Sequence, residues 1–232
     1  MYIVGESYKR FISLFLDAGY RAVKFLDENL TSTAMIILRH DVDWSVEAAV
    51  KVAKWNIELG IFSTFFFLLN SDFYNIFSQR NYEQIVQIAM MGHTVALHLE
   101  KGFCEIPEFA QKTYNIFYDW LSFADKRIIS NHRPSHLTPQ NALLNICKST
   151  YDDKFIKEIK YFSDSGCTWR HYPFDSIEFK EKKSIQMLLH PIWWVYEGSN
   201  AAIKFKKFLA ERKCILQSEI QNSFSAKIDW NI

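Results

Sequence analysis

AMIILRHDVD, residues 34–43, joins an almost unbroken apolar run to two aspartates separated by one residue. Such a run is typical of a strand that is buried on both faces, as in a parallel sheet. Side chains alternate along a strand, so Asp41 is expected to face one way and His40 the other. The stretch therefore predicts a buried strand whose carboxyl end carries a pair of carboxylates.

Five further runs have the same character and length. They are STFFFLL (63–69), HTVALHL (93–99), RIISNH (127–132), KYFSDS (160–165) and IQMLLH (185–190). Amphipathic stretches that are typical of helices lie between them, at 46–59, 82–91, 106–123 and 140–148. This alternation of strands and helices predicts an α/β fold with a parallel sheet, either open or closed into a barrel.

Length and composition narrow the class of protein. The 232 residues contain no repeat or linker, which predicts one domain over 1–232, and the net charge of +1 gives no reason to expect nucleic-acid binding. No apolar run approaches the ~20 residues of a membrane-spanning helix. The N-terminal residues lack the pattern of a secretory signal, and the four cysteines form no CxxC pair. We therefore expect a cytoplasmic protein with reduced thiols and no transmembrane segment; its oligomeric state stays open.

Polar residues gather where the predicted strands end. His40, His98, His132 and His190 each lie at or just past the end of a run. In parallel α/β folds the active site lies at the carboxyl ends of the strands. The pattern therefore predicts a site at that end of the sheet.

Asp41 and Asp43 suit two complementary roles at such a site. One carboxylate can bind a divalent metal, which lowers the pKa of a bound water, and the other can accept a proton from that water. The alternative for Asp43 is to cap the helix that follows, since aspartate is a favoured N-cap.

Two histidines bracket the run at 93–99, and they lie five residues apart. Residues at this spacing face opposite sides of a strand, so only one of them can join the site. His98, at the exit, is the better metal ligand, and His93 is expected to be a core or turn residue. Glu100 is either a further ligand or a solvated carboxylate.

Three more clusters complete the candidate site. His132 is a natural additional metal ligand, and Arg133, followed by a proline, can orient a carboxylate. His190 beside Asp164 is a plausible general acid, because a nearby carboxylate raises the pKa of an imidazolium. Tryptophans beside a polar site can stack on sugars, although most tryptophans are core residues; the candidate substrate-binding residues are Trp169, Arg170 and Trp193.

The five clusters, in this order, resemble the motifs of the polysaccharide deacetylases with a NodB homology domain (carbohydrate esterase family 4). The resemblance covers residues 34–195, the motif-bearing core, between helical N- and C-terminal extensions. It implies a distorted parallel barrel of the NodB-like (β/α)7 type. It also implies that Asp41 is the catalytic base and Arg133 its orienting arginine, that Asp43 and His98 are metal ligands, and that His190 is the acid.

The chain departs from the family pattern in two places. Val42 separates aspartates that are adjacent in the family, and Gly102 stands where the family has its second zinc histidine. His132, Glu100 or His136 would then have to complete the metal shell. His132 is the preferred candidate, because it ends a neighbouring predicted strand.

The resemblance implies a hydrolase that depends on a divalent metal, expected to be zinc, and removes an N-acetyl or N-formyl group from an amino sugar. A protein that is not secreted would act on a small-molecule, nucleotide-linked or lipid-linked sugar in surface-polysaccharide or lipopolysaccharide biosynthesis. The first alternative is a metal-free carbohydrate-binding or inactive deacetylase-like protein. The second is an acyl-transfer or deformylation enzyme on the same kind of sugar.

Overall fold

The computed structural model describes residues 6–27, 33–134, 143, 145–225 and 227–230. The strands are β1 (Arg21–Val23), β2 (Met35–Val42), β3 (Thr64–Leu68), β4 (Thr94–Leu99), β5 (Ile128–Asn131), β6 (Lys148–Ser149), β7 (Lys160–Ser163) and β8 (Ile185–Leu189). The α-helices are α1 (Glu6–Asp17), α2 (Val46–Glu58), α3 (Gln79–Met90), α4 (Lys101–Cys104), α5 (Pro107–Trp120), α6 (Ile177–Lys180), α7 (Pro191–Val195) and α8 (Ala201–Ser223).

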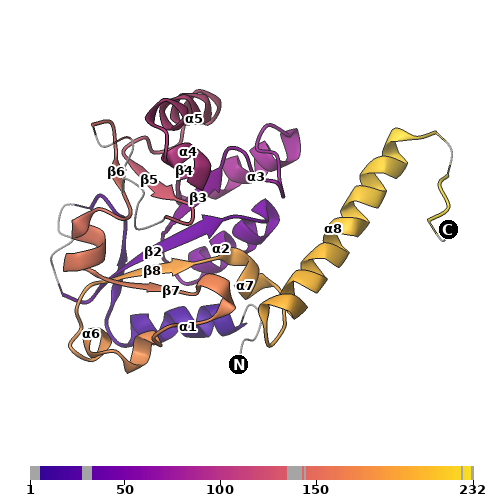
Figure 1. The fold of residues 1–232 in the computed structure, drawn as a ribbon. Coiled ribbons are helices and arrows are strands. Elements are labelled where there is room, and N and C mark those ends of the chain that lie inside the picture. The colour runs from indigo at the N-terminus through magenta and orange to yellow at the C-terminus, as the bar shows by residue number, and fades with distance from the viewer. Residues whose placement is uncertain (1–5, 28–32, 135–142, 144, 226, 231–232) are drawn as a thin grey trace.

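One parallel sheet organises the molecule (Figure 1). Its strand order is β6-β5-β4-β3-β2-β8-β7, with β1 pairing with β2 outside this path. Every pair is parallel, and the six strands that the sequence predicted are all present. The structure adds the short strands β1 and β6, whose two or three residues are too few for a periodic pattern.

The sheet curls so that its two edge regions approach one another. The side chain of Gln186 on β8 donates hydrogen bonds to the carbonyl oxygens of Thr150 and Phe155, at 3.3 and 2.7 Å. Both carbonyls follow β6, at the opposite end of the strand order. The expected distorted parallel barrel is thus confirmed. Hydrogen bonds from the Gln186 side chain connect its two edge regions on the concave side.

The strands separate two apolar layers, because successive side chains alternate between the faces. The inner layer includes Met35 and Ile37 of β2, with Phe66 of β3 and Ala96 of β4. The outer layer receives the intervening residues, such as Ile36, and packs against helices that include α1 and α2. The inner apolar layer fills the end of the barrel at which β2 begins. The opposite end of the barrel, where the strands end, is polar.

Most of the predicted helices are confirmed, but one prediction is wrong in part. Helices α2, α3 and α5 lie where amphipathic stretches were found. The stretch 140–148 was expected to be helical; residues 140–142 and 144 lie outside the described part, 145–146 form a turn, and β6 begins at Lys148. Among the described residues of this stretch, Leu143 and Cys147 are buried and pack into the outer core.

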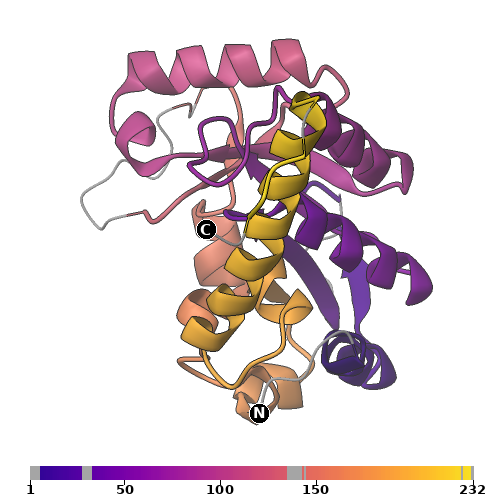
Figure 2. The same cartoon turned by 90° about the vertical axis from the view of Figure 1, so that its right-hand side faces the viewer.

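Helix α8 stands away from the body of the molecule (Figures 1 and 2). Only Lys204 and Phe208 of this helix are buried. Ion pairs of Glu211 with Lys51 on α2 and of Glu219 with Arg80 on α3 connect its later turns to the body. None of the helices in the described ranges has the length and apolar character needed to cross a membrane.

Candidate active site

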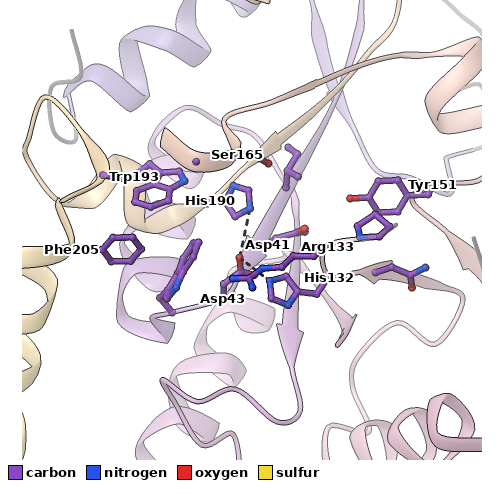
Figure 3. A pocket seen from close by; sticks show the side chains of 15 residues that line it. Asp41, Asp43, His132, Arg133, Tyr151, Ser165, His190, Trp193 and Phe205 are labelled. Carbon is purple, nitrogen blue, oxygen red and sulfur yellow. Dashed lines mark ion pairs between the residues drawn. The ribbon is translucent and has the colours of Figure 1, made fainter. Parts of the chain in front are cut away.

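A cavity of about 340 Å³ opens at the carboxyl ends of the central strands (Figure 3). It is lined by residues from β2, β5, β8 and the loops that follow them. These include Asp41, Asp43, Trp44, Asn131, His132, Arg133, Tyr151, Ser165, His190, Trp193 and Phe205. Side chains from four predicted clusters thus meet at one cavity, as the strand-end pattern predicted.

Asp43, His98 and His132 form a group whose potential ligand atoms all lie within 4.8 Å of one another. Asp43 Oδ1 lies 3.4 Å from His98 Nε2, and Asp43 Oδ2 lies 3.6 Å from His132 Nε2. Asp43 does not cap the next helix, because Ser45 is the N-cap of α2 and accepts the hydrogen bond from the Ala48 amide. The carboxylate of Asp43 is therefore available to contact His98 and His132.

Hydrogen bonds hold both imidazoles with Nε2 toward Asp43. The Nδ1 atom of His98 lies 3.0 Å from the carbonyl oxygen of Ser130, and that of His132 lies 2.9 Å from a carboxylate oxygen of Glu100. A neutral ring that donates from Nδ1 has an unprotonated Nε2, which is the form that binds a metal. Glu100 therefore contacts His132 and is neither a solvated bystander nor a member of the ligand group.

Two buried polar atoms of this group have no hydrogen-bond partner in the described structure, as expected for atoms that bind a cation. Asp43 Oδ1 and His98 Nε2 are both inaccessible to solvent, and neither has a hydrogen-bond partner among the described residues. Burying polar atoms without a partner is costly, and a divalent cation between them would satisfy both. One carboxylate and two imidazoles match the ligand sets of catalytic zinc sites. The residues therefore fit a divalent metal.

The arginine that bonds to Asp41 is Arg39, which the sequence analysis did not single out, whereas the orienting role of Arg133 stays a prediction. Arg39 Nε and Nη2 donate to the two carboxylate oxygens of Asp41 at 2.9 and 2.7 Å, and the pair is almost wholly buried. The two residues share the concave face of β2 because they are two apart. Arg133 is exposed at the rim of the cavity, with a φ of 48°.

The surroundings keep Asp41 ionised. Burial by itself would raise the pKa of this carboxyl group, but Arg39 and, to a smaller extent, His98 hold it well below its usual range. Ser130 Oγ lies 3.3 Å from Asp41 Oδ2 and can donate to it. Asp41 is therefore a fixed carboxylate beside the candidate metal group, 3.5 Å from His98 Nε2.

His190 and Asp164 form a second buried pair. The Nδ1 atom of His190 lies 2.6 Å from Asp164 Oδ1, and Asp164 Oδ2 accepts a 2.8 Å hydrogen bond from Trp194. Burial would lower the pKa of His190, but Asp164, together with Asp43 and Asp41, raises it to about 9. His190 Nε2 lies 3.7 Å from Asp43 Oδ2, so a protonated imidazole faces the metal group from the other side of the cavity.

Aromatic side chains form one wall of the cavity. Trp193 lines it as predicted, and its ring packs against Trp44 and Phe205 at centroid distances of 5.2 and 5.0 Å. Sequence reasoning missed Trp44, although it directly follows the aspartate pair, and Phe205, which comes from the distant helix α8.

Two other expected substrate contacts lie elsewhere. Trp169 is stacked on Phe11 of α1 at 5.4 Å and does not line this cavity, because its ring fills space between the outer helix and the loop after β7. Arg170 lines a neighbouring cavity. The remaining histidine predictions are confirmed for His40 and His93, which bond to Tyr8 and Ala53 in the core, whereas His136 lies outside the described residues.

No family model matches the sequence, and no curated protein matches it either. Solved structures similar to the chain include a peptidoglycan deacetylase of Bdellovibrio bacteriovorus, with 13% identity over 89% of this chain and 67% of the other and a TM-score of 0.46. A chitin deacetylase of Colletotrichum lindemuthianum has 13% identity over 79% and 83% of the two chains, with a TM-score of 0.45. A pseudoenzyme of carbohydrate esterase family 4 from Bacillus anthracis has 14% identity over 80% and 62%, with a TM-score of 0.46.

Proposed function

We propose that the protein is a metal-dependent hydrolase that removes an acyl group from the nitrogen of an amino sugar. The observation that carries this proposal is the convergence of three parts on one cavity. A ligand group, a buried carboxylate and a carboxylate-paired imidazole lie within 4 Å of one another through Asp43 and His98.

Asp43, His98 and His132 would hold the cation, and their oxygen and nitrogen donors favour zinc. A divalent cation supplies Lewis acidity toward the acyl carbonyl and toward water. The protein's part is to fix these donors, and the hydrogen bonds to Ser130 and Glu100 do so for the two histidines.

Asp41 acts as the base in this proposal. Its carboxylate is ionised at neutral pH and held by two hydrogen bonds from Arg39, so it keeps one orientation toward the cavity. The attacking water transfers a proton to the remaining lone pairs of Asp41. In this proposal Arg39 is the residue that orients Asp41, and Arg133 lies in the lining of the cavity.

His190 acts as the acid. Amide cleavage expels an amine, which is a poor leaving group until its nitrogen is protonated. The pKa of about 9 keeps His190 protonated at neutral pH, and Asp164 fixes the ring so that Nε2 faces the cavity. The aromatic wall of Trp44, Trp193 and Phe205 offers the apolar face on which a sugar ring can stack.

The test combines metal analysis with product analysis. The purified protein is loaded with zinc, desalted and assayed for metal content, and then incubated with N-acetyl and N-formyl amino sugars. We expect about one zinc per chain and release of acetate or formate together with a free amine. Absence of stable metal binding would favour the carbohydrate-binding alternative. Transfer of the acyl group to an added acceptor in place of water would favour the acyl-transfer alternative.

We also propose that the protein works in the cytoplasm, on a nucleotide- or lipid-linked amino sugar of surface-polysaccharide or lipopolysaccharide assembly. Supporting this, Cys167 and Cys214 carry free thiols, as is usual in a reducing compartment. Fractionation of the native host cell, with a cytoplasmic marker enzyme as reference, tests the location directly.

A further inference from the structure

A second cavity of about 340 Å³ adjoins the candidate active site, along the outer edge of β7 and the loop that follows it. Ser165 lines both cavities, so the two share a wall at this residue. In Figure 3, Ser165 lies on the side of His190 away from Asp41 and Asp43. The second cavity thus starts beside the acid and leads away from the metal group.

The lining of this cavity is basic and rich in hydroxyl groups. It consists of Lys160, Tyr161, Phe162, Ser163, Ser165, Thr168, Arg170 and His171, and none of these described residues is acidic. Arg170 is exposed, whereas Lys160 forms a 3.3 Å ion pair with Glu178 and keeps 44% of its side chain accessible. Guanidinium, ammonium and hydroxyl groups are the donors that proteins use to bind phosphate.

The backbone of β7 adds further donors. The amides of Lys160 and Asp164 bond to carbonyls of and beside β8, so alternate residues of β7 turn toward that strand. The N–H groups of the intervening residues, Tyr161 and Ser163, therefore point to the other edge, where the second cavity lies. Within the described ranges no strand pairs with this edge, so these amides can also serve an anion.

We propose that the second cavity binds the phosphate or diphosphate group of an amino-sugar substrate. This inference rests on the proposed function, because the acylamino group must reach the metal cavity while the phosphate occupies the neighbouring one. Because Ser165 belongs to the lining of both cavities, they are neighbours, and the proposal places the two ends of one ligand on either side of this residue. The phosphate could belong to a nucleoside diphosphate sugar or to a lipid diphosphate sugar, and both present the same anion.

The first experiment measures anion binding without any catalysis. Inorganic pyrophosphate is titrated calorimetrically into the full chain in the presence of EDTA, so that it cannot bind through a metal. Arg170→Gln and Lys160→Gln are compared with Lys180→Gln, which removes the same charge from an exposed residue of α6 outside the cavity. We expect about tenfold weaker binding for each cavity variant, as for the loss of one charge-assisted contact of ~1.4 kcal/mol, and no change for the control. Undetectable binding, or equal binding by all four proteins, would overturn the proposal.

The second experiment separates this inference from the proposed function. Turnover of an N-acyl amino sugar is compared with that of its 1-phosphate, its nucleoside diphosphate and its polyprenyl diphosphate in detergent. We expect the KM to fall at least tenfold once phosphate is present and to rise again in Arg170→Gln with little change in kcat. Equal KM values for free and phosphorylated sugars would refute the inference and leave the hydrolase standing. Pyrophosphate binding that depends on Arg170, without hydrolysis of any sugar, would refute the hydrolase and leave the anion site standing. The better of the two diphosphates identifies the source of the phosphate.

Discussion

Asp41 and Asp43 lie two residues apart, yet they have different partners. Asp41 is bonded to a guanidinium, whereas Asp43 faces two imidazoles and has an oxygen without a described partner. We therefore expect Asp41→Asn to abolish turnover and keep the metal, and Asp43→Asn to lose the metal. Metal analysis of the two desalted variants checks this. The opposite result would mean that the two carboxylates have exchanged roles.

Arg39 and Arg127 allow a matched comparison of buried and exposed arginine forks. Each donates to both oxygens of an aspartate, Asp41 and Asp125, but Arg127 is 74% exposed and Arg39 is fully buried. Lysine cannot reproduce the two-pronged contact. We expect Arg39→Lys to cost about 3 kcal/mol of unfolding free energy and most of the activity, because it weakens a buried pair. Arg127→Lys should cost less than ~1 kcal/mol. Urea unfolding of both variants measures the difference, and similar losses would contradict it.

His132 is the third residue of the proposed metal group, together with Asp43 and His98. We expect His132→Ala to weaken zinc binding about as much as His98→Ala, on the order of tenfold or more. The sequence left Glu100 open as a further ligand or a solvated carboxylate. Because it holds Nδ1 of His132, Glu100→Ala should now weaken zinc about tenfold, whereas Glu100→Gln keeps an acceptor and should do less. Competition with a chromogenic chelator measures the affinities, and an unchanged affinity in His132→Ala would remove it from the site.

At the scale of elements, the sequence was informative wherever strands are long and buried. Six runs carry a nearly continuous apolar pattern, and each contains a parallel strand of four to eight residues. The pattern also placed Asp41, His98 and His190 at strand ends, where parallel topology brings them together. Strand β6 has only two residues, so no periodicity could reveal it.

The partners that sequence reasoning missed are contacts between elements. The role of Arg39 was missed because a charged residue inside an apolar run does not indicate which carboxylate it bonds to. Its bond to Asp41 follows from alternation along β2, but its contacts with Ser130 and Tyr151 require the curl of the sheet. Phe205 could not be placed in the cavity because α8 lies far along the chain.

Lys204 anchors helix α8 to the body. This lysine is fully buried, and its Nζ donates to the backbone carbonyl oxygens of Trp193 and Tyr196 at the end of α7. Lys204→Met keeps the apolar stem and removes the donor, so it leaves buried carbonyls unpaired, at a cost of about 1–3 kcal/mol. Lys206→Met, at an exposed position of the same helix, is the control and should be neutral. Thermal unfolding compares the two, and equal melting temperatures would show that the contact contributes nothing.

At the scale of the whole molecule, the barrel interior changes from apolar to polar along its axis. Met35 and Ile37 of β2 lie at the base, Arg39 follows, and Asp41 reaches the cavity, all on the same face. The site is thus built on the same strands that hold the core. Its carboxylates cluster within a few ångströms and repel one another unless cations balance them.

The last prediction follows from this coupling of site and core. A metal that binds only the folded chain stabilises it by RT ln(1 + [M]/Kd), about 4 kcal/mol at a thousandfold excess over Kd. For a chain of this size that corresponds to a rise in melting temperature on the order of 10 °C. We expect zinc to raise the melting temperature progressively with concentration. EDTA should lower it to the melting temperature of the metal-free protein, which depends on the Arg39–Asp41 pair and the two apolar layers. Calorimetry of the wild type and of His98→Ala measures this dependence.

The variant decides what such a shift means. Zinc also binds cysteines and histidines of an unfolded chain, which would reduce the stabilisation but not create it. In His98→Ala the rise should disappear, and the melting temperature in EDTA should fall below that of the wild type, because the variant removes the imidazole between Asp41 and Asp43, loses the contact with the Ser130 carbonyl and leaves a cavity. A zinc-dependent rise that survives in His98→Ala would place the bound metal elsewhere on the molecule. A wild type indifferent to both zinc and EDTA would leave the barrel as a scaffold for binding sugars without a metal.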